Sequence, residues 1–363
     1  MNETYHPCLQ RWIERVRGAA ADRTPLCLRG SGSKDFYGQS LVCELFDTQE
    51  YAGIVAYEPT ELVLTARSGT PLAELEAVLA KSGQSLAFEP PYFGAGATLG
   101  GCVAAGLSGP RRVQAGAVRD FVLGVKMLDG NGELLTFGGQ VMKNVAGYDV
   151  PRLLAGSLGT LGLMLEISLK VLPFPVAEQT LRFQLAQEQA LALLNRYGGQ
   201  PLPISASAWC DNVLHLRLSG AAAAVSAASR TLAGQPVSAE EATSFWLGLR
   251  EQSHAFFAGD APLWRIAVPS TCPALELPGA QLVEWGGAQR WMRGDTHSID
   301  PAVRSVAEKA GGHATLFRAD ASMKTRFGTF QPLSAPLARI HRHLKSAFDP
   351  HGVFNPGRLY PEF

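Results

Sequence analysis

The 363-residue sequence predicts an α+β protein, and two observations support this prediction. In the first 170 residues, short apolar runs typical of strands are mixed with helical segments that have start and stop signals. From about residue 176 to residue 310, alanine- and leucine-rich segments are interspersed with further short strands. Such a mixture is typical of α+β folds, and the length allows two domains or one large one.

The first half of this pattern begins with two strands and a helix. The segments "GIVAYEP" and "ELVLTAR" are predicted strands. The segment "PLAELEAVLAKS" is a predicted helix, because Thr70 and Pro71 supply a start signal and Gly83 a stop signal.

A hairpin and an alternating strand follow. The segments "FVLGVKML" and "ELLTF" flank "DGNG" at residues 129–132. Asp-Gly and Asn-Gly are typical of tight turns, so a β-hairpin is predicted here. In "EISLKVL" the residues alternate between two faces, with Ile167, Leu169 and Val171 on one and Ser168 and Lys170 on the other. The prolines of "PFPVAEQ", at 173 and 175, then indicate a boundary.

The second half is predicted to form a separate α+β unit. It contains the alanine-rich segments "LAQEQALALLNRYG" and "GAAAAVSAASRTLAG" and the strands "VLHLRLSG" and "PLWRIAVP". The chain ends in an amphipathic helix and an irregular tail rich in proline and glycine. We therefore expect three parts: residues 1–172, residues 176–330 and a C-terminal helix and tail at 331–363.

Composition and charge exclude several classes of function. Lysine plus arginine number 32, as do aspartate plus glutamate, so no net field favours nucleic acid or an anionic membrane. The N-terminus lacks the apolar core of a signal peptide, and no window has the length and apolarity of a membrane span. We expect a cytoplasmic protein whose membrane contact, if there is any, goes through a partner.

The six cysteines are scattered, without a CxxC pair or any spacing typical of metal ligands. This pattern indicates reduced thiols of a cytosolic protein. It also predicts that the chain itself holds no iron–sulfur cluster.

Four glycine-rich segments require a common explanation: residues 29–38, 90–112, 143–167 and 348–359. None fits a Rossmann fingerprint or a P-loop. Together they fit a dinucleotide held by several loops, because "GSGS" and the helix start near Thr98 both supply backbone donors for a pyrophosphate. Backbone groups between Gly159 and Leu163 would line a slot for a flavin ring. Each segment alone is commonly just a turn, whereas four in one order are more specific.

The order of these segments resembles the vanillyl-alcohol oxidase (PCMH) type of FAD-binding domain. The resemblance implies a two-subdomain FAD-binding domain followed by an α+β cap. Over the whole chain, "VRDFVLGVKMLDGNGELLTFGGQVMKNVAGYD", "GGHATLFR" and "FDPHGVFNPGRLYP" resemble the FAD-binding subunits of bacterial glycolate oxidases. The similarity is strong over residues 25–172, good at the C-terminus and loose over 176–280.

The resemblance implies a set of FAD-binding residues, and we expect the FAD to be noncovalent. The first loop has no histidine for covalent attachment, and Cys102 is predicted to be helical and buried. The implied contacts are Arg29, Gly30, Ser31, Gly32, Ser33, Lys34, Thr98, Leu99, Gly100, Gly101, Ser108, Gly109, Val118, Arg119, Gly156, Ser157, Gly159, Thr160, Gly162, Leu163, Asn355 and Arg358.

Catalytic residues are harder to assign. Related 2-hydroxyacid dehydrogenases carry a "GDGNLH"-type histidine motif and a later Glu-His-Gly that bind a divalent metal and substrate, and this chain has neither. His341 and His343 lie two apart on a predicted helix and so point to different faces, and we expect no protein-bound metal.

The remaining weak candidates are Arg265, Arg290, His313 and Arg318, with Trp285 beside them. An arginine in a pocket facing the flavin would suit a carboxylate. The favoured alternative is structural: Arg265 and Arg318 cap strands or form ion pairs, His313 is a satisfied core histidine, and Trp285 and Trp291 pack.

The missing motif leads to one expected function and two alternatives. We expect an accessory or electron-transferring FAD subunit of a glycolate dehydrogenase complex, which converts glycolate to glyoxylate. Its expected partners are a homologous FAD subunit that carries the histidine motif and an iron–sulfur subunit that passes electrons to quinone. Through this complex the chain would lie at the inner face of the plasma membrane. The alternatives are a self-sufficient FAD-dependent 2-hydroxyacid dehydrogenase and a scaffold without cofactor.

Overall fold

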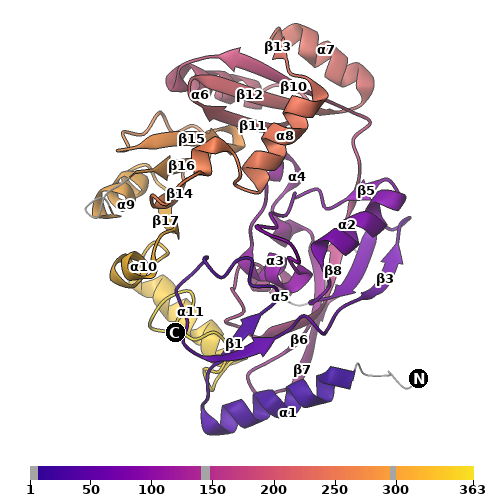
Figure 1. The fold of residues 1–363 in the computed structure, drawn as a ribbon, viewed down its shortest axis with the longest axis vertical. Coiled ribbons are helices and arrows are strands. Elements are labelled where there is room, and N and C mark those ends of the chain that lie inside the picture. Colours follow the sequence, from indigo (N-terminus) through magenta and orange to yellow (C-terminus); the bar gives the residue numbers. More distant parts are fainter. Residues whose placement is uncertain (1–6, 140–147, 295–299) are drawn as a thin grey trace.

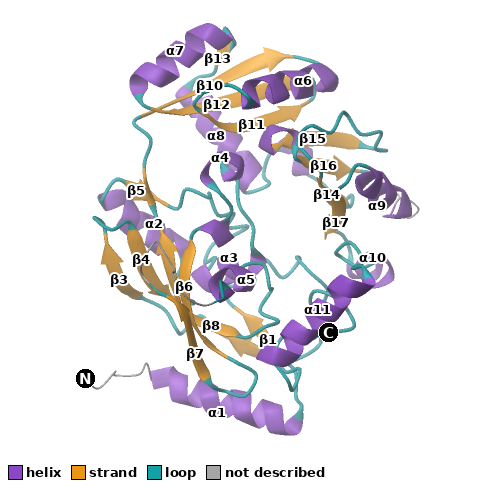
Figure 2. Ribbon diagram, turned by 180° about the vertical axis from the view of Figure 1, so that it is seen from behind, coloured by secondary structure: helices purple, strands orange, loops and turns teal. Residues whose placement is uncertain are grey.

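A computed structural model describes residues 7–139, 148–294 and 300–363 of the chain. Figure 1 shows two bodies, one built on each of two antiparallel sheets, with the C-terminal helix beside the first body near β1. Figure 2 shows the same arrangement from behind. The α+β prediction is confirmed, since both bodies combine a sheet with helices packed on it.

The first body contains a five-stranded antiparallel sheet with strand order β3-β4-β8-β6-β7. Its strands are β3 (Ile54–Glu58), β4 (Val63–Arg67), β6 (Val122–Leu128), β7 (Leu134–Gly138) and β8 (Leu163–Lys170). Two further pairs are parallel β1 (Leu26–Arg29) with β2 (Glu44–Asp47) and antiparallel β5 (Gln84–Ser85) with β9 (Leu172–Pro173). The helices are α1 (Pro7–Asp22), α2 (Leu72–Lys81), α3 (Leu99–Ala105), α4 (Arg112–Ala115) and α5 (Val150–Leu154).

The second body contains an eight-stranded sheet with strand order β13-β10-β12-β11-β15-β16-β14-β17. Its strands are β10 (Ala177–Gln184), β11 (Ile204–Cys210), β12 (Val213–Gly220), β13 (Gln235–Pro236), β14 (Leu263–Ala267), β15 (Ala280–Glu284), β16 (Gln289–Arg293) and β17 (His313–Arg318). The helices of the second half are α6 (Gln187–Gly198), α7 (Ala222–Leu232), α8 (Ala239–Arg250), α9 (Asp300–Lys309), α10 (Ala321–Phe327) and α11 (Ala335–Phe348).

The elements predicted from local patterns form as expected. The helix α2 buries Leu72, Leu75 and Leu79, which recur on one face at helical spacing. The β6–β7 hairpin closes through Asp129, whose carboxylate accepts the backbone N–H groups of Asn131 and Glu133 at 2.9 and 2.8 Å. These patterns suffice because every contact that defines them is local.

The strand β8 alternates as predicted, yet its polar residue Ser168 is buried. The strand lies between β4 and β6, and most of the residues on both of its faces are buried. The Ser168 hydroxyl lies 2.8 Å from that of Thr65 on β4, which satisfies both buried groups. A central strand therefore keeps the alternation without exposing either face.

The chain leaves the first sheet at Lys170 and enters the second at Ala177. The final segment returns to the first body, where Leu26 of β1 forms a parallel bridge with Phe354. This path fits the division into residues 1–172, 176–330 and 331–363, which we retain as a proposal. None of the helices in the described parts is long and apolar enough to cross a membrane.

The C-terminal segment is held by a buried ion pair. Lys345 Nζ lies 2.6 Å from Asp349 Oδ2 and also donates to the carbonyl oxygens of Thr160 and Phe354 at 2.8 and 2.7 Å. Asp349 in turn accepts the backbone N–H groups of Val353 and Phe354. Burial lowers the pKa of Lys345, although the carboxylate of Asp349 opposes this shift. The pair therefore fixes the tail against the turn that contains Thr160.

One sequence-based expectation about the cysteines is wrong. Cys27 and Cys43 form a disulfide, with their Cα atoms 5.4 Å apart, whereas all six cysteines were expected to be reduced. The parallel pairing of β1 with β2 sets Leu26 opposite Glu44 and so brings Cys27 beside Cys43. A separation of 16 residues in the sequence gives no sign of this pairing. The other four cysteines keep their thiol groups: Cys8, Cys102, Cys210 and Cys272.

The disulfide predicts a thiol count. Protein denatured without a reductant should expose four reactive thiols, and the same sample should expose six after reduction. Titration with a chromogenic thiol reagent measures both numbers. Six thiols in the unreduced sample would contradict the bond.

The buried ion pair predicts a stability loss. In Lys345→Met the carboxylate of Asp349 stays buried without its cation, so the free energy of unfolding should fall by about 3–5 kcal/mol. Urea denaturation followed by circular dichroism measures this change. The control is Arg342→Met, three residues earlier on the exposed side of the same helix, which should change the free energy of unfolding by no more than about 0.5 kcal/mol. An equal fall in the free energy of unfolding in the two variants would show that the buried ion pair adds no stability beyond that of an exposed arginine.

Candidate functional site

The first glycine-rich loop follows directly from β1. Gly30 approaches the start of α3 so closely that a Cβ atom there would lie 2.4 Å from Thr98 Oγ1. Gly32 has a φ of +80°, which favours glycine. Among the described residues, none accepts a hydrogen bond from the backbone N–H groups of residues 30–34. The loop therefore presents free backbone donors, the arrangement that binds phosphate oxygens.

The second segment supplies the start of α3. Thr98 caps the helix by accepting the backbone N–H of Gly101 at 3.3 Å. Gly100 donates its N–H to the carbonyl of Ser68 at 2.7 Å, and a Cβ on Gly100 would lie 2.8 Å from Ser68 Cβ. The hydroxyl of Ser68 is buried without a hydrogen-bond partner among the described residues. A buried hydroxyl without a protein partner is available to a polar group of a bound ligand.

The third segment forms a turn that packs on α3. The backbone N–H groups of Gly156 and Leu158 donate to the carbonyls of Val103 and Ala104 at 3.0 and 2.9 Å. Gly106 allows this close approach, because a Cβ atom on it would lie 2.7 Å from the Cα of Gly156. Residues 143–147 of the predicted segment lie outside the described residues.

The C-terminal tail joins the first loop to this turn. Asn355 accepts the backbone N–H of Leu28 at 2.8 Å and donates to the carbonyl of Leu158 at 2.6 Å. Arg358 donates to the carbonyls of Gln39 and Asp35 at 2.7 and 2.9 Å. One tail thus fixes both ends of the loop that bears the free donors.

These segments enclose a cavity of about 500 Å³, which we call the loop cavity. A smaller cavity of about 60 Å³ continues it past Ser68 toward the turn at residues 157–162, and the two share Leu28, Gly30, Gly101 and Asn355 among their walls. The predicted residues that line one or both are Arg29, Gly30, Ser31, Gly32, Ser33, Lys34, Thr98, Gly100, Gly101, Gly159, Gly162, Leu163, Asn355 and Arg358.

Other predicted cofactor contacts lie away from the loop cavity. Ser108 and Gly109 line a separate, smaller cavity described below. Leu99 belongs to the core under α3, and Arg119 is exposed. Val118 is buried and donates its N–H to Ser108 Oγ at 3.0 Å. Gly156, Ser157 and Thr160 build the turn itself, since Ser157 Oγ accepts from Gly159 and Thr160 donates to the Ser157 carbonyl.

The structure also adds cavity residues that the sequence patterns missed. Ser68 follows β4 in "ARSG", and only its burial without a partner marks it as part of the site. The disulfide Cys27–Cys43 lies in the wall of the loop cavity, because β1 carries the first loop. Further wall residues are Leu28, Asp35, Ser40, Leu41, Leu45, Thr48, Ala104, Ala105, Leu158 and Met164.

The second sheet approaches these loops from the other side. Glu251, which follows α8, accepts the backbone N–H groups of Tyr92 and Phe93 at 3.0 and 2.9 Å. Trp285 donates its indole N–H to the carbonyl of Gly109 at 3.2 Å. The loop at Tyr92 and Phe93 and the loop at Gly109 are therefore both held by side chains of the second body.

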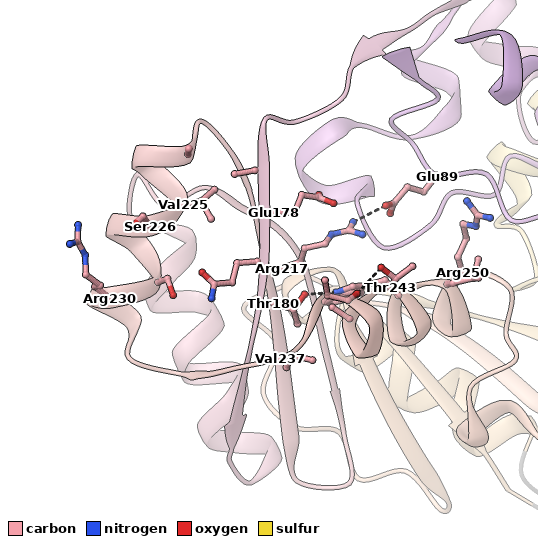
Figure 3. A pocket seen from close by; sticks show the side chains of 18 residues that line it. Glu89, Glu178, Thr180, Arg217, Val225, Ser226, Arg230, Val237, Thr243 and Arg250 are labelled. Atoms are coloured by element: carbon pink, nitrogen blue, oxygen red, sulfur yellow. Dashed lines mark hydrogen bonds and ion pairs between the residues drawn. The ribbon is translucent and has the colours of Figure 1, made fainter. Parts of the chain in front are cut away.

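A cavity of about 830 Å³ lies beside this contact, between β10, β12, α7 and α8, and we call it the side groove. Figure 3 shows Arg217 extending from the sheet toward Glu89, with Nη2 and Oε1 2.8 Å apart. Burial alone would raise the pKa of Glu89, but the guanidinium groups of Arg217 and Arg111 hold it below its usual range. Arg111 also pairs with Glu178. These four charges neutralise one another and connect the two bodies. They therefore leave no net charge in this groove to attract a ligand.

A further cavity, of about 30 Å³, lies between the second sheet and the loops at residues 91–93 and 107–110, and we call it the interface cavity. Arg265 lines it and donates to the Tyr37 hydroxyl at 3.2 Å. Trp291 lines it too, and its indole N–H donates to Glu284 Oε2 at 2.6 Å. Leu107 follows two residues after Ala105, which lines the loop cavity, so the two cavities flank the end of α3.

The other predicted catalytic candidates are placed differently. Arg290 is fully buried and donates to the carbonyls of Gly287 and Cys272, a structural role. Arg318 donates to Gln252 at 2.9 Å and stacks on Phe36, with its guanidinium carbon 3.7 Å from the ring centre. His313 is exposed at the start of β17, so its prediction as a core histidine is wrong.

Of the two structural roles expected for Arg265 and Arg318, strand capping or ion pairing, the ion pairs do not form among the described residues. Among the described residues, neither Arg265 nor Arg318 lies in an ion pair with a carboxylate. Both stack on aromatic rings of Phe317 and its neighbours instead, which satisfies the face of a guanidinium but leaves its edge free. The sequence could not show this, because the aromatic partners come from segments far apart in the chain.

The histidines and cysteines do not form a metal site in the described part of the chain. No three of the described histidine, cysteine, aspartate and glutamate side chains gather into a group that could hold a metal ion. His341 packs against Tyr360 and Phe363, whereas His343 on the same helix is exposed, so the two point in different directions as predicted. Cys102 is helical and buried, also as predicted, and burial raises the pKa of its thiol to about 12.

Comparisons with known proteins agree with this geometry. Residues 10–138 match a protein family described as "FAD binding domain". The chain is 49% identical over 353 residues to the glycolate oxidase subunit GlcE of Escherichia coli, covering 97% of each chain. It is 32% identical over 165 residues to the glycolate oxidase subunit GlcD of Bacillus subtilis, covering 44% of this chain and 34% of that protein.

A solved structure has the same fold. An alkyldihydroxyacetonephosphate synthase superposes with a TM-score of 0.65, covering 95% of this chain and 73% of that one at 16% identity. With the family match, this confirms the predicted FAD-binding fold of the vanillyl-alcohol oxidase type. The free donors at residues 30–34 and the unpartnered Ser68 hydroxyl fit FAD, which carries a pyrophosphate and a polar ribityl chain.

The close approach of Gly30 to Thr98 predicts a loss of FAD binding in Gly30→Ala. The new methyl group would force Thr98 and the start of α3 apart, which weakens FAD binding roughly 5- to 150-fold, for about 1–3 kcal/mol of overpacking. The ratio of flavin to protein after purification, and the dissociation constant from a fluorescence titration, measure the loss. The matched control is Gly18→Ala, where nothing lies within 4 Å of the added Cβ. Wild-type affinity for FAD in Gly30→Ala would show that this loop does not bind the cofactor.

Proposed function

The chain belongs to the family of FAD-binding glycolate oxidase subunits that includes GlcE, and from this premise we propose that it serves a multi-subunit glycolate dehydrogenase as an electron-transferring flavin subunit. The observation that best supports this proposal is the loop cavity. Four segments from distant parts of the sequence meet there around free backbone donors, and the C-terminal tail holds them in place. FAD supplies the two-electron chemistry that such a subunit needs.

We propose that the FAD is bound noncovalently and that residues 29–34 hold its pyrophosphate. The first loop has serines where a histidine would be needed for attachment. The thiol of Cys102 is buried, and its pKa of about 12 keeps it protonated and unreactive near neutral pH. The wall residues of the two joined cavities are the proposed contacts for the rest of the cofactor.

The absent histidine motif supports an accessory role for this chain. The proposed partners are a homologous FAD subunit that carries this motif and accepts electrons from glycolate, and an iron–sulfur subunit that passes them to quinone. In this arrangement the complex reaches the membrane through its partners, at the inner face of the plasma membrane. The product of the complex is glyoxylate.

A second candidate function is that this chain oxidises a small 2-hydroxy acid by itself. The observation that favours it is the interface cavity, which contains an arginine without a carboxylate partner among the described residues. A third possibility, a scaffold without cofactor, agrees poorly with the loop cavity, because glycines kept at costly backbone positions serve no purpose in a decayed site.

The visible spectrum of the chain purified alone, before and after anaerobic addition of glycolate, separates these functions. We expect a flavin band that stays oxidised, because the chain lacks the histidine motif of its relatives that react with substrate. A band that bleaches would show that this chain is itself the dehydrogenase. If no flavin band appears, even after coexpression with the partner subunits, the chain would be a scaffold without cofactor and the proposed function would be wrong.

A further inference from the structure

The disulfide between Cys27 and Cys43 closes the part of the chain that carries the free backbone donors. Cys27 lies on β1 and Cys43 directly before β2, with their Cα atoms 5.4 Å apart. The enclosed residues 28–42 contain the whole first loop at residues 29–34. Both cysteines line the loop cavity. The bond therefore joins the two ends of the segment that we propose holds the pyrophosphate of FAD.

The second half of this closed segment, residues 38–43, is weakly held apart from the disulfide, and we call it the strap. At its start, the backbone N–H of Gln39 donates to the carbonyl of Arg358 at 2.9 Å, and Arg358 donates to the Gln39 carbonyl at 2.7 Å. No described residue hydrogen-bonds to the backbone of residues 40–43. Ser40 and Leu41 nevertheless line the loop cavity. The disulfide is therefore the strongest tie between this wall of the cavity and the first body.

The strand that follows the strap adds little further support. β1 and β2 form a separate two-stranded sheet, and each strand has four residues. On its other side β1 meets the tail at Phe354, so β2 is the edge of this sheet. Phe46 of β2 is buried, but Leu45 beside it is exposed. A short edge strand opens more easily than a central one, so β2 cannot replace the disulfide as an anchor for the strap.

The disulfide is accessible to a small thiol. Each of its cysteines is half-buried rather than buried. Glu44, which follows Cys43, pairs with Arg15 at 2.5 Å. Arg29, on β1, pairs with Asp35 at 2.6 Å. Each pair is neutral, so neither repels an incoming thiolate.

We propose that the Cys27–Cys43 disulfide is a reversible modification site that acts as a clasp on bound FAD. A dithiol opens the clasp, the strap moves away from the loop cavity, and FAD is released faster. The inference rests on the proposed placement of FAD in the loop cavity. In a compartment that keeps thiols reduced, a disulfide of this kind acts as a redox sensor rather than as a permanent crosslink.

The reaction is a two-electron thiol–disulfide exchange. One thiolate of the dithiol attacks one sulfur, the S–S bond breaks, and the departing cysteine takes up a proton. The second thiol of the reagent then attacks the mixed disulfide, which frees the other cysteine and leaves the reagent as a cyclic disulfide. Cys27 and Cys43 end as two thiols, with two electrons and two protons from the dithiol. The flavin takes no part in this exchange.

The clasp acts on FAD through the order of the loop rather than through a contact of its own. While the bond is intact, the donors at residues 30–34 keep the spacing that a pyrophosphate requires. After cleavage the segment gains conformational freedom, which it must lose again each time FAD binds. The hydrogen bonds of Asn355 and Arg358 remain, so binding weakens without being abolished.

The test measures the rate of FAD release from the flavin-loaded chain before and after treatment with dithiothreitol. Released flavin is separated by rapid gel filtration, and the visible absorbance band shows that the flavin stays oxidised. Thiols counted after quenching and denaturation should rise from four to six when the bond is cleaved. We expect FAD release to become at least about tenfold faster and to slow again after reoxidation. Circular dichroism shows that the reduced chain stays folded.

Two variants assign the effect to the disulfide. Cys27→Ser/Cys43→Ser lacks the bond, so it should release FAD at the rate of the reduced wild type and should not respond to dithiothreitol. The control is Cys210→Ser, which removes a half-buried thiol at the end of β11 and should respond as the wild type does. Because the reduction is done on the wild-type chain, the inference is tested even if the double variant does not fold.

Every other outcome counts against the clasp or against the proposed function. An unchanged rate of FAD release in a folded chain with six thiols would overturn the inference and leave the proposed function intact. A bond that dithiothreitol cleaves only after denaturation would overturn it as well. Loss of the response in Cys210→Ser would assign the effect to that thiol. A chain that binds no flavin even without any reductant would instead mark the failure of the proposed function.

Discussion

The buried pair of Lys345 and Asp349 is the interaction on which the geometry of the cofactor site depends. Both side chains are removed from water, so each needs the other, and their remaining hydrogen bonds all go to backbone groups of the tail and of one turn. This fixes the position of Asn355, which lies six residues after Asp349. Asn355 then joins β1 to the turn at Leu158. The C-terminus is therefore a structural part of the cavity whose first loop begins about 325 residues earlier.

The contact between the two bodies contains charged side chains that are paired with opposite charges and others that are not. In the side groove, arginines and glutamates from the two bodies pair with one another, and these pairs fix how the second sheet sits on the loops. In the interface cavity, an arginine and a glutamate each lack an opposite charge among the described residues. Buried groups that are paired stabilise a structure, whereas buried groups without a counter-charge are typical of sites that bind or react.

The two cavities differ in a chain whose sequence lacks the histidine motif described above. The side chains that its second sheet contributes to the interface cavity include Arg265 and Glu284. In this chain the loop cavity is lined largely by glycines and backbone groups, whereas the cap contributes charged side chains to the interface cavity. The glycine-rich loops and the cap are therefore under separate physical constraints.

The sequence by itself determined the elements whose defining contacts are local and the identity of the loops that need glycine. The helix α2, the β6–β7 hairpin and the cap of α3 by Thr98 follow from residues within a few positions of one another. The glycine cluster that contains residues 30 and 32 was recognisable in the sequence, and the structure uses it for the close approach at Gly30 and the positive φ at Gly32. The order of these segments also sufficed to predict the FAD-binding family, which the comparisons confirmed.

Only the tertiary structure decided which distant residues meet. It paired Cys27 with Cys43 through parallel strands, exposed His313, and buried Arg290 among carbonyl groups. It also brought Arg265 and Glu284 to one cavity, although nothing in their local sequence distinguishes them from other charged residues of strands. A side chain's charge state and partners depend on burial and on neighbours from other strands, and these are set by sheet order and by the packing of two bodies rather than by spacing along the chain.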